Sequence, residues 1–173
     1  IFKESSVSGN NNGLWCSAES WEKVGAETND SYPQNPDDIA IIPYYSLDSR
    51  SINLGGDVAV GELYVGGYCD NKAYVTLGTN NSSYKRKLSL CREDGKMAIV
   101  QLCSSSLDLG NNAYRATLKF SDGLALVEFL SDTTLSGGWD GTDSNHPQGR
   151  FDFSAKTNSI SDNVTVMLRE MDT

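Results

Sequence analysis

One short pattern of apolar and polar positions recurs along the middle of the chain. An apolar residue, any residue and a second apolar residue are followed by a small or turn-forming pair. The copies begin 7 to 13 residues apart, at residues 52–56, 63–67, 75–79, 88–92, 100–104, 107–111 and 118–122. Alternation with a period of two places both apolar residues of a copy on one face of a strand. Each copy is therefore predicted to be one short β-strand followed by a sharp turn.

The same alternation predicts which side chains are buried. We expect these residues to point inward: Ile52, Leu54, Leu63, Val65, Val75, Leu77, Leu88, Leu90, Val100 and Leu102. The residues between them, Asn53, Tyr64, Thr76, Ser89 and Gln101, are expected to point outward. No segment of sufficient length shows helical periodicity, so the predicted fold class is all-β.

The similar endings of the copies favour a short parallel β-helix, or β-solenoid, with an irregular N-terminal cap. Stacked coils place equivalent corners above one another, and these corners need the same backbone freedom. Two copies per coil would give a repeat of about 23 residues, which is within the range of solenoids. Strand spacing alone fits a β-sandwich or jelly roll as well, and this remains the alternative.

We expect a single all-β domain over residues 1–173. Residues 1–43 form a leader and cap, because they combine a polar loop at 10–13 with two tryptophans and most of the prolines. Residues 44–130 hold the repeated strands. The pattern weakens after residue 122, so residues 131–173 are predicted to form a C-terminal loop and a closing strand.

The cap region resembles the opening of extracellular parallel β-helix proteins, in particular the G8 domain. The resemblance is carried by the series Gly13-Leu14-Trp15, Ser20-Trp21, Pro33 or Pro36, and the segment 37–43 with its Asp-Asp-Ile-Ala-Ile-Ile-Pro sequence. It covers about residues 13–79. The resemblance implies an extracellular context with a role in handling polysaccharide, in adhesion or in surface assembly, and it implies no catalytic residues.

Net charge and hydropathy exclude two classes of partner. A formal charge of −9 and a pI near 4.5 argue against nucleic acid, whose phosphates need a clustered cationic face. The sequence contains no apolar run of about 18 residues, so we expect no membrane span.

Several features predict a secreted or cell-surface protein. Ile1 in place of Met is typical of a removed signal peptide. Four cysteines without C-x-x-C spacing favour disulfides, and we expect the pairs Cys91–Cys103 and Cys16–Cys69. Glycosylation sequons begin at Asn29, Asn80, Asn81 and Asn163.

Candidate sites are few. The single histidine, His146, lacks a nucleophile motif, and we expect no catalytic residue. The glycine-rich loop 137–145 suggests calcium as the one cofactor to consider, with Asp140, Asp143 and Asp152 as ligands. Trp139 in this loop is a candidate platform for a sugar ring.

These features predict a non-enzymatic extracellular structural or adhesive module. A solenoid has two open ends with unpaired backbone groups, so we expect a homo-oligomer or a surface filament. One alternative is a carbohydrate-binding or polysaccharide-cleaving β-helix domain. Another is a jelly-roll coat or pilin-like subunit that donates a terminal strand.

Overall fold

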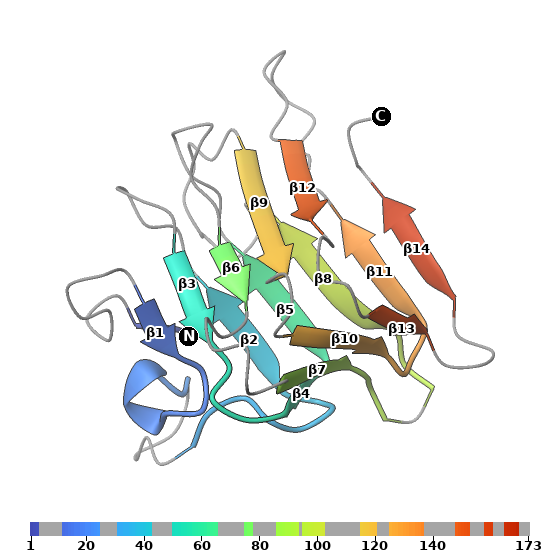
Figure 1. The fold of residues 1–173 in the computed structure, drawn as a ribbon. Helices are drawn as coiled ribbons and strands as arrows, with labels where there is room; N and C mark the ends of the chain where they lie inside the picture. The colour runs from blue at the N-terminus through green and yellow to red at the C-terminus, as the bar shows by residue number, and fades with distance from the viewer. Residues whose placement is uncertain are drawn as a thin grey trace.

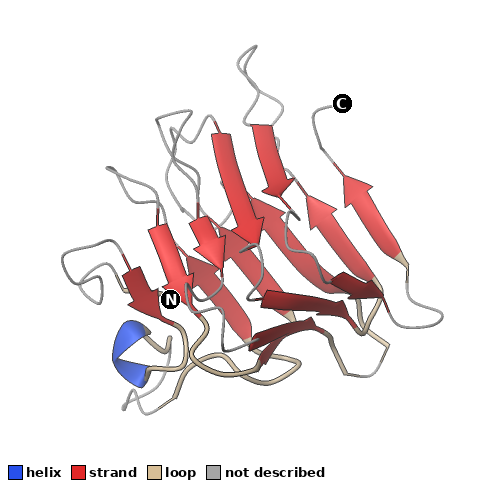
Figure 2. Ribbon diagram, in the orientation of Figure 1, coloured by secondary structure: helices blue, strands red, loops and turns tan. Residues whose placement is uncertain are grey.

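The structure is a computed structural model that describes part of the chain. The described residues are 1–3, 12–24, 31–42, 50–65, 75–77, 86–93, 95–102, 115–120, 125–136, 148–152, 158–160 and 165–169. Apart from one turn of 3-10 helix, η2 (Ala18–Ser20), every element in these ranges is a β-strand (Figure 2). The predicted all-β class is confirmed.

The strands form three sheets in which all neighbouring strands are parallel (Figure 1). Sheet 1 contains β1 (Asn12–Leu14), β3 (Arg50–Asn53), β6 (Val75–Leu77), β9 (Arg115–Phe120) and β12 (Gln148–Asp152). Sheet 2 contains β4 (Val58–Val60), β7 (Arg86–Leu90), β10 (Ala125–Phe129) and β13 (Asn158–Ile160). Sheet 3 contains β2 (Ile39–Ile42), β5 (Glu62–Val65), β8 (Ala98–Leu102), β11 (Thr133–Ser136) and β14 (Val166–Arg169).

The chain visits the three sheets in a fixed order. From β3 onward it passes from sheet 1 to sheet 2 to sheet 3 and then returns to sheet 1. We call each set of three successive strands a layer: β3–β5, β6–β8, β9–β11 and β12–β14. Each strand pairs with the strand at the same position in the next layer, for example β5 with β8 and β8 with β11. A jelly roll is built from antiparallel strands, so these parallel pairs do not fit that alternative.

A layer contains three strands, whereas the sequence pattern predicted two per repeat. The strand that the pattern missed in the first layer is β4, Val58–Val60. Its middle residue is Ala59, which is apolar, and Gly61 alone separates β4 from β5. The alternation and the small pair that identified the other strands are therefore absent at β4. The predicted copy at 107–111 lies outside the described residues.

The core lies between the three sheets, and the predicted inward side chains are confirmed wherever they are described. Ile52, Leu54, Leu63, Val65, Leu77, Leu88, Leu90, Val100 and Leu102 are at most 1% exposed. The side chains of Val75 and Thr76 lie outside the description. Among the outward residues, Asn53 is exposed, while Tyr64 and Gln101 are half-buried.

Ser89 differs from its predicted exposure, since it is only 6% exposed. It lies in the middle of sheet 2, between Ala59 of β4 and Glu128 of β10. Its hydroxyl donates to Glu128 Oε2 at 3.2 Å. Neighbouring strands of a stacked sheet can thus cover a small residue even on the outer face.

The layered order continues beyond residue 130, where the sequence indicated a loop and a closing strand. Strands β11 to β14 take the same places as their counterparts in earlier layers. The pattern is hidden because polar residues occupy strand positions. Thr133 is fully buried, and its hydroxyl is satisfied by donating to the Ser131 carbonyl at 2.8 Å.

The N-terminal cap covers one end of the core with aromatic side chains. Phe2, Trp15 and Trp21 are at most 2% exposed and meet edge to face, with ring centroids 5.1 Å apart for Phe2–Trp21 and 4.8 Å for Trp15–Trp21. Each buried indole N–H has an acceptor: Trp15 Nε1 donates to the Pro33 carbonyl at 2.7 Å, and Trp21 Nε1 to the Trp15 carbonyl at 2.8 Å. The cap also supplies β1 to sheet 1 and β2 to sheet 3.

Candidate functional site

A polar cluster lies at the corner between sheets 2 and 3. Arg92 follows β7, and its Nη1 donates to Glu62 Oε1 at the start of β5. Its Nε lies 3.4 Å from Asp37 Oδ1 in the cap. The side chains of Arg92 and Glu62 are only 15% and 14% exposed. One guanidinium therefore connects the cap and two successive layers.

Tyr64 closes this cluster on the outer face of sheet 3. Its hydroxyl donates to Glu62 Oε2 at 2.7 Å. Burial, together with the hydrogen bond and the negative charge of Glu62, raises the pKa of Tyr64 to about 12. Both carboxylate oxygens of Glu62 are thus engaged. The arrangement stabilises the corner, and it leaves Glu62 poorly placed to act as a general base.

The next layer extends the polar corner through backbone contacts. Ser131 follows β10, its Oγ accepts a hydrogen bond from Arg92 N–H at 2.9 Å, and it donates to the Arg92 carbonyl at 3.1 Å. In the layer before, Gly61 N–H donates to the Asp38 carbonyl at 3.0 Å. A Cβ on Gly61 would lie 2.3 Å from the Pro36 carbonyl oxygen. The close approach of the cap to β5 therefore requires glycine at this corner.

The two described cysteines, Cys16 and Cys91, are free thiols. The structure therefore does not contain the predicted Cys91–Cys103 and Cys16–Cys69 bridges; Cys69 and Cys103 lie outside the described residues. Burial raises the pKa of both thiols, and the carboxylates of Asp37, Glu93 and Glu128 add to the effect at Cys91. Raised pKa values keep these sulfurs protonated at neutral pH, so they are poor nucleophiles.

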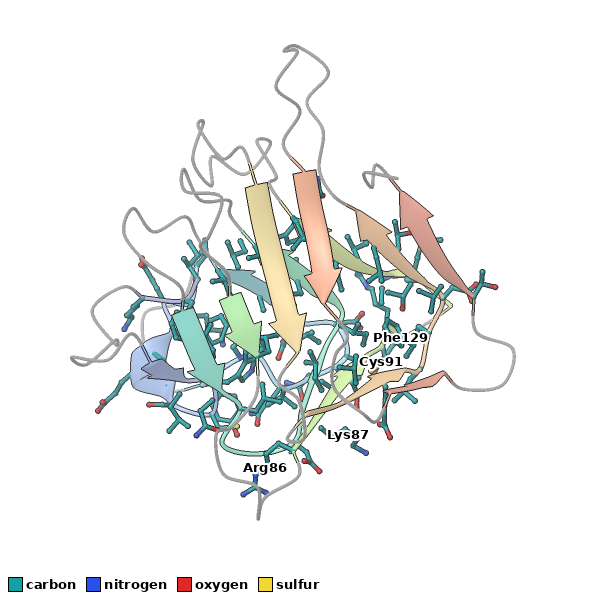
Figure 3. All side chains as sticks on the ribbon, turned by 45° about the horizontal axis from the view of Figure 1, so that its top comes forward. Arg86, Lys87, Cys91 and Phe129 are labelled. Carbon is teal, nitrogen blue, oxygen red and sulfur yellow. The ribbon has the colours of Figure 1, made fainter. Side chains whose placement is uncertain are left out.

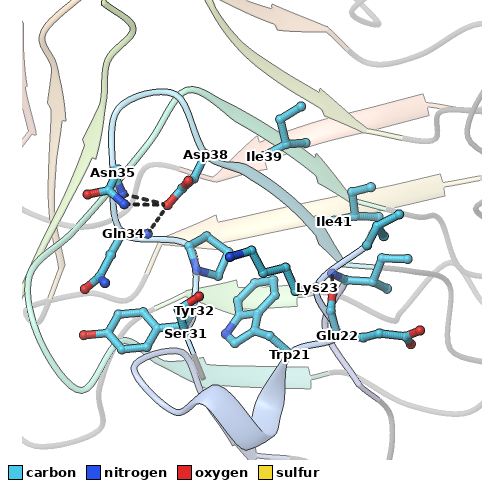
Figure 4. A pocket seen from close by; sticks show the side chains of 13 residues that line it. Trp21, Glu22, Lys23, Ser31, Tyr32, Gln34, Asn35, Asp38, Ile39 and Ile41 are labelled. Atoms are coloured by element: carbon cyan, nitrogen blue, oxygen red, sulfur yellow. Dashed lines mark hydrogen bonds between the residues drawn. The ribbon is translucent and has the colours of Figure 1, made fainter. Parts of the chain in front are cut away.

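A cavity lies between β2 and the part of the cap that precedes it (Figure 4), with a volume of about 470 Å³. Ile39 and Ile41 of β2 line one side, and Trp21 and Tyr32 of the cap line the other. The Tyr32 hydroxyl is hydrogen-bonded to the Cys16 thiol, and this hydrogen bond raises the pKa of Tyr32. This volume is typical of sites that bind small molecules or side chains.

The wall of the cavity near Asp38 is held by a tight turn. Asp38 Oδ2 accepts hydrogen bonds from the Gln34 and Asn35 backbone N–H groups, both at 2.9 Å, and from Asn35 Nδ2 at 3.2 Å. The Asp38 carbonyl accepts from Gly61 and Glu62 N–H. These contacts fix the turn 34–38 against the first layer. Sequence reasoning missed this cavity because its walls come from three separate segments.

Most residues that the sequence proposed as sites lie outside the described residues. These are Trp139, Asp140, Asp143 and the sequon asparagines Asn29, Asn80, Asn81 and Asn163, and His146, for which no role was expected, also lies outside them. Asp152 is the last residue of β12, paired in register with Lys119, and its side chain is not described. The calcium and sugar-stacking sites therefore stay predictions.

Within the described ranges, no group of three or more His, Cys, Asp or Glu side chains is arranged to hold a metal ion. In the same ranges no helix is long and apolar enough to span a membrane. In sheet 2, Lys87 Nζ of β7 lies 3.2 Å from Glu128 Oε2 of β10. Lys87 is labelled in Figure 3.

No protein-family model, curated protein or solved structure matches this chain. Its class therefore rests on its own geometry, which is that of three sheets of parallel strands with a polar corner between sheets 2 and 3 and an aromatic cap over one end.

Proposed function

We propose that the chain is a short parallel β-helix that serves as a non-enzymatic, extracellular structural or adhesive module. The fixed order in which the chain visits the three sheets is the observation that carries this proposal. Buried residues repeat in register through the layers, as in the series Leu63, Val100 and Leu135 of sheet 3. Such stacked layers are rigid and make extended surfaces, which suits a protein that binds or assembles.

The extracellular part of the proposal is supported by the sequence. The sequons and the resemblance of the cap to G8 domains favour export. Mass spectrometry of peptides from the exported protein tests this part. Glycans at Asn29, Asn80, Asn81 or Asn163 would support it, and unmodified asparagines at all four positions would count against it.

Assembly is proposed at the end formed by β12, β13 and β14, which are the last strands of their sheets in the described part of the chain. Thr133 N–H donates to the Thr165 carbonyl at 2.9 Å, so the backbone groups of Thr165 face β11. Because successive residues of a strand face opposite sides, the N–H and C=O of Val166 face away from β11. A second copy can add strands to such an edge.

A charged side chain at this edge tests the assembly. Thr165 is exposed, and its N–H donates to Asp132 Oδ1 at 2.8 Å, so Thr165→Lys keeps the backbone contact, whereas Thr165→Pro would lose it. We expect Thr165→Lys to reduce association, measured by light scattering and negative-stain microscopy. Val24→Lys is the matched control, because Val24 is 75% exposed in the cap at the other end. Equal association of the parent and Thr165→Lys would contradict this route of assembly.

A further inference from the structure

The outer edge of β2 carries backbone groups that β5 does not use. β2 is the end strand of sheet 3. Glu62 N–H donates to the Asp38 carbonyl at 3.2 Å, so Asp38 faces β5. Since successive residues face opposite sides, Ala40 also faces β5, and the N–H and C=O groups of Ile39 and Ile41 face the outer edge.

An extended segment already uses part of this edge. Phe2 N–H donates to the Ile41 carbonyl at 2.8 Å, and Phe2 also bridges Trp21 in antiparallel fashion. The edge is therefore open to hydrogen bonding from a neighbouring strand. Ile39 lies two residues before Ile41 and faces the same outer edge. Within the described residues no strand lies beside Ile39 on this edge, and the cavity lies there instead.

The cavity offers room for side chains of an added strand. Ile39 is 52% exposed and Ile41 is half-buried, and both side chains line the cavity opposite Trp21 (Figure 4). The volume of about 470 Å³ exceeds that of a single aliphatic side chain. An apolar residue of an added strand can therefore be buried here beside Ile39.

β2 itself, with the sequence Ile-Ala-Ile-Ile, contains no charged residue and no proline, which are two of the features that discourage an edge strand from pairing with another chain. The lining of the cavity includes two carboxylates, Glu22 and Asp38, and two ammonium groups, Lys23 and the N-terminus at Ile1. The preference for a basic partner therefore comes from the net charge of −9 of the whole chain.

From these contacts we propose that the edge of β2 and the adjoining cavity bind an extended, basic segment of a partner polypeptide by strand addition. The partner's backbone bonds to Ile39, and one of its apolar side chains fills the space between Ile39 and Trp21. This interaction is separate from the assembly of copies through β12, β13 and β14, because it uses the opposite end of sheet 3.

The first experiment uses a labelled, end-capped peptide of sequence Lys-Val-Thr-Val-Thr-Val-Lys with the full chain. We expect saturable binding by fluorescence anisotropy, and a slowing of amide hydrogen exchange at Ile39 by at least about tenfold at saturation. The same peptide with N-methyl groups on alternate residues keeps its side chains and charge but loses half of its backbone donors. It is expected to bind at least about tenfold more weakly, because strand addition depends on main-chain hydrogen bonds.

The second experiment changes the protein. Ile39→Lys should weaken binding at least about fivefold, since a charge on an edge strand discourages pairing. Leu130→Lys is the control, because Leu130 is 45% exposed and does not line the cavity. Any one of four outcomes would overturn the proposal. These are equal binding of the N-methylated peptide, an unaffected Ile39→Lys variant, no peptide binding, and saturation of the cavity by methyl glycosides alone. Light scattering of the same samples shows whether the complex contains one copy, so failed assembly and failed peptide binding are distinguished.

Discussion

At Tyr64 a phenol and the Glu62 carboxylate share a hydrogen bond on the outside of sheet 3. The folded-state pKa of Tyr64, about 12, is above its ordinary value of 10.0. The folded state therefore holds this proton more tightly than the unfolded state does. The corresponding stability is fully present below about pH 10 and is lost as the pH rises from about 10 to about 12.

Tyr64→Phe tests this linkage, because it removes the titrating group and keeps the ring. The parent should lose more stability than the variant between about pH 9 and about pH 11.5, as measured by urea denaturation. Tyr32→Phe provides a second pH profile for comparison, because the Tyr32 hydroxyl is hydrogen-bonded to the Cys16 thiol and not to a carboxylate. Parallel pH profiles for the parent and Tyr64→Phe would contradict the assignment.

The buried face of the strands can be tested at Leu77, which is fully buried in β6. Leu77→Ala should reduce the free energy of unfolding by about 2 to 5 kcal/mol, because it removes transfer energy and leaves a cavity. Gln101→Ala is the control on the outer face of β8, where Gln101 is half-buried, and it should cost well under that amount. Equal losses in denaturant titrations would show that the register is misassigned.

The thiols of Cys16 and Cys91 provide a further prediction at this scale. Because burial raises the pKa of both, alkylation by iodoacetamide at neutral pH should be slow in the folded protein and faster after unfolding in urea. Peptide mass spectrometry can follow each site separately. Rapid alkylation of both sites in the folded state would contradict the predicted protection.

At the scale of elements, the corner between β4 and β5 depends on a single glycine. Gly61→Ala would place a Cβ 2.3 Å from the Pro36 carbonyl oxygen and 3.0 Å from Arg92 Cγ, so the cap must shift. We expect a loss of more than about 2 kcal/mol in the free energy of unfolding, through displaced corner contacts.

Gly95→Ala is the matched control for this prediction. Gly95 has a φ of +68°, and an added Cβ there meets nothing within 4 Å. Its cost should be limited to about 1 kcal/mol of backbone strain. Thermal or urea denaturation compares the two variants directly. A smaller loss for Gly61→Ala than for Gly95→Ala would contradict the packing described at the corner.

At the scale of the whole molecule, the two ends of the sheets differ. The cap buries Phe2, Trp15 and Trp21 over one end of the core. The proposed assembly therefore joins the end formed by β12, β13 and β14 to the same end of a second copy. A contact between identical surfaces closes after two copies, so a pair is expected as long as the cap stays in place.

Ionic strength should promote this pairing. Each copy carries a net charge of −9, and salt screens the mutual repulsion beyond about 8 Å at physiological ionic strength. Light scattering across a salt series should show a shift from single copies to pairs as salt increases. Dissociation at high salt would indicate that ion pairs hold the contact, and growth into filaments would indicate that the capped end also takes part.

The sequence by itself determined the local part of this fold. Alternating residues such as Leu63 and Val65, or Val100 and Leu102, identified strands and their buried faces, because burial on one side of a strand leaves a period of two in the sequence. The turn-forming pairs after Leu54 and Leu90 identified two corners, between β3 and β4 and between β7 and β8, and the other predicted pairs lie outside the described residues. The resemblance of the cap to G8 domains predicted an extracellular role but no site.

Only the tertiary structure decided how the strands are grouped and what they bring together. Three strands per layer, and not two, follow from parallel pairings such as β4 with β7, which have no local signature at Val58–Val60. Arg92 reaches Glu62 across 30 residues of sequence and Asp37 across 55. The cavity beside β2 is likewise built from segments that meet only after folding. Such contacts depend on which strands stack, and no pattern of period two along a single segment records that choice.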